Sequence, residues 1–117
     1  MATDFRSGRD FPRRGREEID GFLWLARVSD KGRASAAGTI YDYIYPCPMD
    51  RGVFEHWGIT DRQFDEALRS TRTDDELVAW LRERVSDSQR ERANRWLLDE
   101  KSGNMDRQDR EEGVLAA

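Results

Sequence analysis

The stretch TDRQFDEALRSTRTDDELVAWLRERVSDSQRERANRWL, residues 60–97, contains the clearest local signals in the chain. At three places a Ser or Thr is followed three residues later by Glu or Gln, which is the spacing of a helix capping box. The pairs are Thr60 with Gln63, Thr73 with Glu76, and Ser86 with Gln89. Apolar residues recur at helical intervals after each pair. We therefore predict three consecutive helices, with Ser88 as a competing start for the last one.

A Pro-Cys-Pro stretch upstream predicts a further short helix. Proline suits the first position of a helix, because its φ is already helical and it has no N–H to leave unpaired. With Pro48 in that position, Cys47 becomes the N-cap and Asp50 the third helical residue. We expect this helix to run to about Trp57 and to end at Gly58.

The N-terminal part shows helical spacing as well. The apolar residues at intervals of three and four are Ile19, Phe22, Leu23 and Ala26. This pattern predicts a helix that begins near residues 13–16. The chain then either turns at residues 30–32 or continues as a helix bent at Gly32, since glycine is a poor helix former. Gly38 is the expected C-terminal stop.

Residues 39–45 form the only strand-like segment. Tyr41, Tyr43 and Tyr45 alternate with other residues, which is the period of an extended chain. A lone strand leaves half of its backbone groups unpaired. The segment must therefore pair with a partner chain, curl against the helices, or form an extended loop, and we favour the last two.

These elements predict an all-α or nearly all-α fold. We expect a compact single domain of five or six short helices over residues 11–101, with one short extended Tyr-rich segment. Residues 1–10 are polar and predict a flexible N-terminal arm. Residues 102–117 are acidic and weakly apolar, and we expect a frayed, flexible tail there, because Ser-Gly-Asn at its start ends the preceding helix.

Composition narrows the classes of partner. Of the 117 residues 38% are charged, and the net charge of −4 does not attract nucleic acid or an anionic membrane. The arginines at positions 6–16 are the one candidate for a nucleic-acid arm, but nearby acidic residues offset them. No apolar run approaches the roughly 20 residues that a membrane span needs. With one cysteine the chain builds no internal disulfide, so we expect a cytoplasmic protein.

Residues 27–50 concentrate the groups that a binding site would use. The candidate ligand-binding residues are Arg27, Asp30, Lys31, Arg33, Tyr43 and Tyr45. Arginine and lysine would supply charge for a small anionic ligand or a protein segment, and the phenol hydroxyls would orient it. The alternative is a structural network in which Asp30 pairs with Arg27 or Arg33, because ion-pair networks also gather charged groups.

Cys47 is the only candidate nucleophile, and it defines a second hypothesis. Helix N-terminal N–H groups favour a thiolate, and Asp50 or a tyrosine would act on a proton in a thiol-dependent enzyme or redox sensor. A buried, inert cysteine is the alternative. His56 has no convergent partners at ligand spacing, so we expect no metal site and no cofactor. A third hypothesis is a structural protein that dimerises through residues 39–45.

Several short motifs carry a family resemblance. They are Pro12-Arg13-Arg14, Leu25-Ala26-Arg27, Asp30-Lys31-Gly32-Arg33-Ala34, Ala37-Gly38, Tyr45-Pro46-Cys47-Pro48-Met49-Asp50, Gly58-Ile59 and the helix from Asp75-Glu76 to Trp80. Over about residues 11–100 the chain resembles a family of small, mostly bacterial proteins, the domain of unknown function family 5069. The resemblance implies no activity, cofactor or site, but its pattern falls on residues 27–50.

Overall fold

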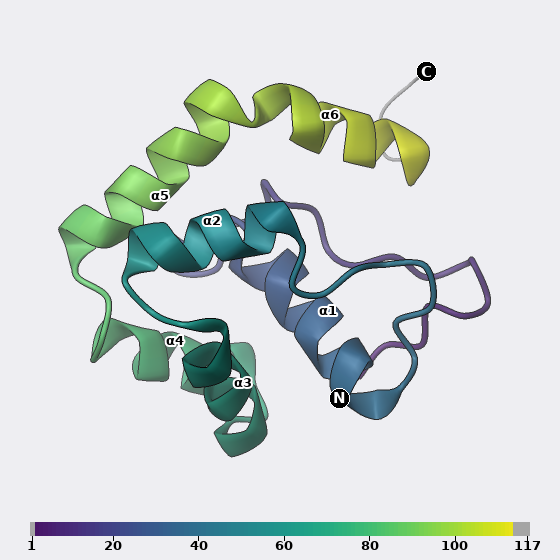
Figure 1. The fold of residues 1–117 in the computed structure, drawn as a ribbon, viewed down its shortest axis with the longest axis horizontal. Coiled ribbons are helices and arrows are strands. Elements are labelled where there is room, and N and C mark those ends of the chain that lie inside the picture. Colours follow the sequence, from purple (N-terminus) through teal and green to yellow (C-terminus); the bar gives the residue numbers. More distant parts are fainter. Residues whose placement is uncertain (1, 114–117) are drawn as a thin grey trace.

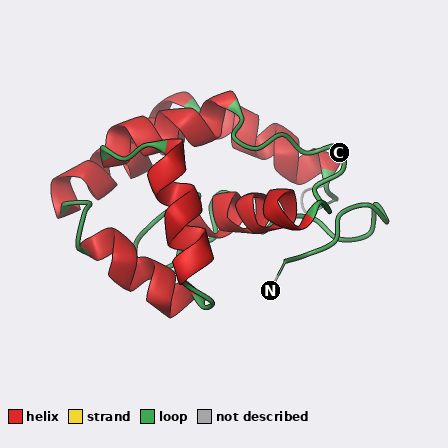
Figure 2. Ribbon diagram, turned by 60° about the horizontal axis from the view of Figure 1, so that its bottom comes forward, coloured by secondary structure: helices red, strands yellow, loops and turns green. Residues whose placement is uncertain are grey.

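The computed structural model describes residues 2–113, over which the chain forms six helices (Figure 1) and no strand (Figure 2). The helices are α1 (Leu25–Ala37), α2 (Pro48–Trp57), α3 (Asp61–Ser70), α4 (Asp74–Arg82), α5 (Asp87–Glu100) and α6 (Ser102–Glu111). The radius of gyration of the Cα atoms is 13.5 Å, close to the value of about 13 Å for one domain of this size. The prediction of an all-α single domain is confirmed.

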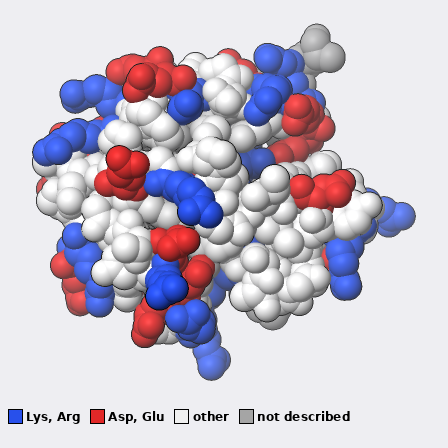
Figure 3. Space-filling model, in the orientation of Figure 1, with Lys and Arg blue, Asp and Glu red and all other residues white. Residues whose placement is uncertain are grey.

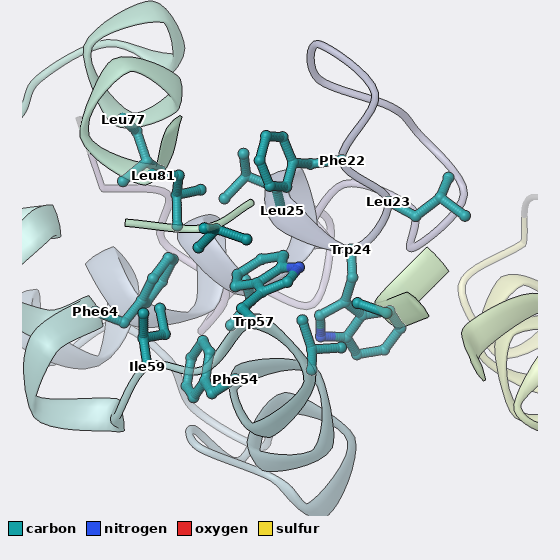
Figure 4. Close-up of a cluster of buried hydrophobic side chains, with 14 of the residues drawn as sticks. Phe22, Leu23, Trp24, Leu25, Phe54, Trp57, Ile59, Phe64, Leu77 and Leu81 are labelled. Atoms are coloured by element: carbon teal, nitrogen blue, oxygen red, sulfur yellow. The ribbon is translucent and has the colours of Figure 1, made fainter. Parts of the chain in front are cut away.

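The core consists of aromatic and aliphatic side chains from the segment before α1 and from all six helices, and Figure 4 shows part of it. Trp24 at the start of α1, Trp57 of α2 and Phe64 of α3 have no solvent-accessible surface. Helix α2 packs against α5 and α1 against α3, and α5 and α6 form an arch over α2 at the top of Figure 1. The predicted apolar faces therefore meet in one interior.

All three predicted capping boxes are present at the starts of α3, α4 and α5. In each box the cap hydroxyl accepts from the N3 backbone N–H, with an N–O distance of 3.1 Å. Helix α5 begins after Ser86, not at the competing Ser88. The predicted α2 is confirmed from Pro48 to Trp57, with Cys47 as its N-cap.

The prediction of a first helix beginning near residues 13–16 is wrong, because α1 begins at Leu25. Ile19 and Phe22 instead face each other across a tight turn, each accepting the other's backbone N–H at 3.0–3.1 Å. Asp20 and Trp24 have positive φ values of 51° and 73°, which a helix excludes. The spacing that suggested a helix comes from this turn, which directs consecutive apolar side chains into the core.

Helix α1 continues through Gly32 and ends at Gly38, as predicted for its stop. A side chain at Gly32 would place a Cβ 2.4 Å from Leu68 Cδ1 of α3 and 3.2 Å from the Tyr45 ring. The glycine therefore lets α3 and the segment after α1 approach the helix closely. Gly38 adopts the left-handed conformation, with φ of 73°, that terminates many helices.

Residues 39–45 form turns and irregular loop, as favoured from the sequence. Tyr41 has a positive φ of 55°, which breaks the alternation that suggested a strand. Tyr41 and Ile44 are exposed, while Tyr43 and Tyr45 are half-buried. The segment thus curls over the end of α1.

The expectation of a frayed tail over residues 102–117 is wrong for residues 102–111, which form α6. Met105 and Asp109 of α6 are buried, so the helix is docked through an apolar and an acidic side chain. Residues 114–117 lie outside the described residues. In the expected N-terminal arm, Phe5 is buried and its backbone N–H donates to Thr39 O at 2.9 Å.

Charges of both signs are interspersed on the face shown in Figure 3. Three arginines of the suggested nucleic-acid arm are engaged by carboxylates: Arg13 by Asp30 and Asp74, Arg14 by Asp109, and Arg16 by Asp106. None of the helices described for residues 2–113 is long and apolar enough to cross a bilayer.

Candidate functional site

The residues singled out in the 27–50 stretch lie at four separate places around α1. A helix turns by about 100° per residue, so neighbouring charges point to different sides. Arg27 meets the end of α6, Asp30 meets the N-terminal segment, and Lys31 meets the start of α2. Arg33 meets α3 and its C-terminal loop. The eight predicted residues do not line one common cavity.

Arg27 forms a buried cluster with Glu112 and Tyr43. Its Nη1 and Nη2 atoms donate to Glu112 Oε1 and Oε2 at 2.9 and 2.6 Å, a bidentate pair. The Tyr43 hydroxyl donates to Glu112 Oε2 at 3.1 Å. Burial, followed by the charge and hydrogen bond of Glu112, raises the pKa of Tyr43 above its ordinary value.

Asp30 accepts hydrogen bonds from Arg13. The alternative interpretation from the sequence, a structural network in which Asp30 pairs with Arg27 or Arg33, names the wrong partner. The Asp30 carboxylate takes the Arg13 backbone N–H at 2.8 Å and two guanidinium N–H groups at 3.1 Å. Arg13 also donates to Asp74 of α4 at 2.6 Å and holds the pKa of that carboxyl below its ordinary value. This cluster ties the N-terminal segment to α1 and α4, which is a structural role.

Lys31, Cys47 and Asp50 converge at the N-terminus of α2. The Lys31 ammonium lies 2.7 Å from Asp50 Oδ2 and 3.2 Å from Cys47 Sγ. The Asp50 carboxylate also accepts the Cys47 backbone N–H at 2.9 Å and Trp24 Nε1 at 2.8 Å. Asp50 is fully buried and Lys31 nearly so, whereas Cys47 is half-buried. A buried cation therefore faces the sulfur of a half-buried residue.

An open cavity of about 570 Å³ lies between α1, α3 and the loop that precedes α2. Its walls include Gly32, Arg33, Ala36, Tyr45, Asp65 and Arg69. The Tyr45 hydroxyl donates to Asp65 Oδ1 at 2.7 Å. Burial, and then this hydrogen bond, raises the pKa of Tyr45 above its ordinary value. Of the predicted ligand-binding residues, Arg33 and Tyr45 line this cavity.

Sequence reasoning missed the partners of these groups. Asp65, which is not among the predicted residues, accepts from Tyr45, and Arg69 lies 3.6 Å from Glu66. Glu112 lies in the segment expected to be a frayed tail. A helical spacing of carboxylates at 106, 109 and 112 was the available signal for its role.

The single histidine takes part in packing. The His56 ring stacks on Trp96 of α5, with 4.9 Å between ring centroids, and its Nδ1 lies 2.7 Å from Gly52 O. In the described portion of the chain, no group of three or more His, Cys, Asp or Glu side chains is arranged to hold a metal ion.

The family described as Domain of unknown function (DUF5069) matches residues 9–116, nearly the whole chain. The chain therefore belongs to this family. A search of the curated proteins finds no match.

Proposed function

We propose that the protein is a binding module that holds a small anionic ligand with an apolar body in the cavity between α1 and α3. The cavity volume of about 570 Å³ lies within the range of about 300–1,000 Å³ that is typical of small-molecule sites. The apolar part of the ligand would lie on Ala36, Pro46 and Leu68. The proposal extends the expectation of a ligand near residues 27–50.

The main support for the proposal is the hydrogen bonding of Arg33, a cation at the wall of the cavity. Its guanidinium donates to Leu68 O, Thr71 O and Thr71 Oγ1 at 3.0–3.3 Å. These bonds fix its orientation but use only part of its five N–H donors. No carboxylate pairs with Arg33 among residues 2–113, whereas Arg13 and Arg27 are each paired. Arg33 is thus a held cation at the wall of an open cavity.

The remaining charges of the cavity favour a ligand with an anionic end. The Arg69 side chain is 69% exposed and pairs loosely with Glu66 at 3.6 Å. Arg33 and Arg69 together outweigh the one carboxylate of the wall, Asp65. The second oxygen of Asp65 is a hydrogen-bond acceptor for a ligand N–H or O–H.

Thermal-shift screening with aliphatic and aromatic carboxylates and phosphate esters tests this function. A ligand at 100 times its Kd stabilises the fold by about 2.7 kcal/mol. Arg69→Glu reverses a charge without breaking a buried contact, and Ala36→Trp fills the cavity from an exposed position. Both variants should lose the stabilisation, whereas the α3 surface control Arg62→Glu should retain it. The proposal fails if no anion stabilises the wild type or if these variants respond like the wild type.

A second candidate, a thiol-dependent enzyme or redox sensor, is favoured by the position of the Lys31 ammonium 3.2 Å from Cys47 Sγ. The Asp50 backbone N–H also points at the sulfur, at 3.4 Å, as an N-cap donor. A cation and a backbone N–H donor next to the sulfur are features of reactive cysteines, while the Asp50 carboxylate places a negative charge in the same cluster. Asp50 would act here as a positioning residue, because its oxygens already accept from Lys31, Cys47 and Trp24.

The rate of alkylation of Cys47 by iodoacetamide tests the second candidate. The native chain is compared with the same chain unfolded in urea, both at about neutral pH. An activated thiolate predicts faster alkylation in the native state despite partial burial. Slower or equal alkylation in the native state would contradict the thiol-dependent function and would not affect the ligand-binding proposal.

A further inference from the structure

Helix α6 is attached to the rest of the molecule in a different way from the other helices. Its sequence, SGNMDRQDRE, contains one large apolar residue, Met105, which is buried. Two acidic residues of α6, Asp106 and Asp109, and its C-cap residue Glu112 are spaced by three residues. This spacing places the three side chains along one side of the helix. We call Asp106, Asp109 and Glu112 the acidic stripe.

Each carboxylate of the acidic stripe meets an arginine from the first 27 residues. Arg16 Nη1 lies 2.6 Å from Asp106 Oδ1, and Arg14 Nη2 lies 2.8 Å from Asp109 Oδ2. The third pair, between Arg27 and Glu112, is the bidentate one described above. We call Arg14, Arg16 and Arg27 the arginine row. None of its members lines the cavity between α1 and α3.

One member of the arginine row, Arg27, is held in place by parts of the chain other than α6. Arg27 donates to Arg13 O at 3.3 Å, and its guanidinium lies 5.8 Å from the centroids of the Trp24 and Tyr43 rings. Its Nε atom is buried and has no hydrogen-bond partner in the described chain. The side-chain hydrogen bonds of Arg14 and Arg16 in the described chain all go to α6 residues. Displacement of α6 therefore leaves these two guanidinium groups without their partners and able to bind other carboxylates beside the fixed Arg27.

Stability alone does not account for this arrangement. Solvent-exposed ion pairs contribute about 0–1 kcal/mol, and the partly exposed Arg16–Asp106 pair is close to that class. A buried pair is often no better than apolar side chains of the same volume. A helix held by carboxylates and one methionine detaches more easily than one held by an apolar face. Lys101 is the only residue between α5 and α6.

We propose that the arginine row is a binding site for an acidic helical segment of a partner protein, and that α6 occupies this site as an intramolecular substitute. The charge complementarity defines the partner: carboxylates spaced by three residues on one side of a helix. Because a short connection gives α6 an effective concentration on the order of millimolar, a partner binds when its segment offers more apolar contact than Met105 or when α6 is weakened.

Peptide binding to the full chain tests the proposal. The probe is a fluorescent peptide of residues 101–113, and the matched control peptide carries Asp106→Asn, Asp109→Asn and Glu112→Gln. The receptor is the full chain with the same three substitutions, in which the resident helix no longer competes through charge. The acidic peptide should bind at least about tenfold more tightly than the control peptide, and its affinity should fall as NaCl is raised.

Two further measurements keep the result interpretable. Arg14→Gln in the receptor should weaken binding of the acidic peptide, since Arg14 contacts Asp109 and lies outside the core. If the triple variant does not fold, hydrogen exchange of the wild-type α6 amides replaces it. Excess acidic peptide should then raise their exchange rate several-fold, and the control peptide should not.

Three outcomes overturn the proposal. One is equal binding of the acidic peptide and the control peptide, and another is the absence of any binding or displacement. The third is a concentration-dependent dimer of the wild-type chain in which α6 is exchanged between copies, because the site then serves a second copy of this chain and not a partner protein.

Discussion

The interior between α1 and α5 and the contact between α6 and the arginine row hold the fold together by different forces. In the interior, Trp24, Trp57 and Phe64 are completely buried, and each large apolar side chain contributes about 2–3 kcal/mol. The α6 contact combines the buried Met105 with guanidinium–carboxylate pairs. Salt screens the partly exposed Arg16–Asp106 pair but has less effect on the buried Arg27–Glu112 pair. The comparison predicts that substitutions in the core cost more stability than a substitution in the partly exposed pair of the α6 contact.

The largest expected effect is in the core. Trp57→Ala removes a fully buried indole and should cost about 4–5 kcal/mol of unfolding free energy, at the upper end for such truncations. Trp80→Ala is the matched control, because Trp80 is only half-buried and its loss should cost much less. Urea denaturation measures both. Equal costs would mean that the interior does not dominate stability.

The core also contains an ion pair, and removing its charge should have the next largest effect. Asp50→Asn leaves the Lys31 ammonium buried without its carboxylate and should cost about 3 kcal/mol. Asp75→Asn, at an exposed position of α4, is the control and should change little. If Asp50→Asn is neutral, burial of the Lys31–Asp50 pair does not matter to folding.

Helix caps should contribute less than the core. Ser86→Ala removes the hydroxyl that accepts from the Gln89 backbone N–H and should cost about 1 kcal/mol. Ser88→Ala removes the competing serine, which caps no helix, and should cost less than about 0.5 kcal/mol. Chemical denaturation of the two variants checks this. The reverse order would place the start of α5 at Ser88.

Alkaline pH should lower the free energy of unfolding by a smaller amount, through Tyr45 at the cavity wall. The pKa of Tyr45 is raised in the folded protein, so the unfolded chain ionises first as pH rises above the ordinary value of about 10. The contribution of Tyr45 is therefore fully present below about pH 10 and is lost above it, by about 0.8 kcal/mol at about pH 10.5. Tyr45→Phe should reduce this loss, measured by urea denaturation at about pH 9 and 10.5. The exposed control Tyr41→Phe should not.

The smallest expected effect is in the α6 contact. Asp106→Asn breaks the partly exposed pair with Arg16 and should cost about 0.5 kcal/mol at low salt. The cost should vanish in about 1 M NaCl, where the screening length is about 3 Å. Denaturation at both salt concentrations measures this. A cost that persists at high salt would show that α6 is held by more than charge.

Much of the fold was predictable because its signals are local. A capping box such as Thr73 with Glu76 joins residues three apart, so residue types and spacing are enough to place the start of a helix. The same holds for Cys47 and Asp50 at the start of α2. The predicted helix before Leu25 was wrong because the spacing of Ile19 and Phe22 is compatible with both a helix and a tight turn.

The candidate site was predictable only in part. The sequence indicated that residues 27–50 carry the reactive groups, and Arg33 and Tyr45 do line a cavity. It contained no information on Asp65 as the partner of Tyr45, or on which side of α1 each charge faces. Those partners come from separate helices whose relative orientation depends on packing at positions such as Gly32.

The starts of α2 to α5 follow from local sequence, because caps and apolar spacing act over one or two turns of a helix. Two features depend on tertiary packing: residues 102–111 form a helix, and Arg27 contacts Glu112, 85 residues away. The physical reason is that a polar helix with one buried methionine has little stability alone. It is stabilised by arginines that the folding of the rest of the chain places beside it.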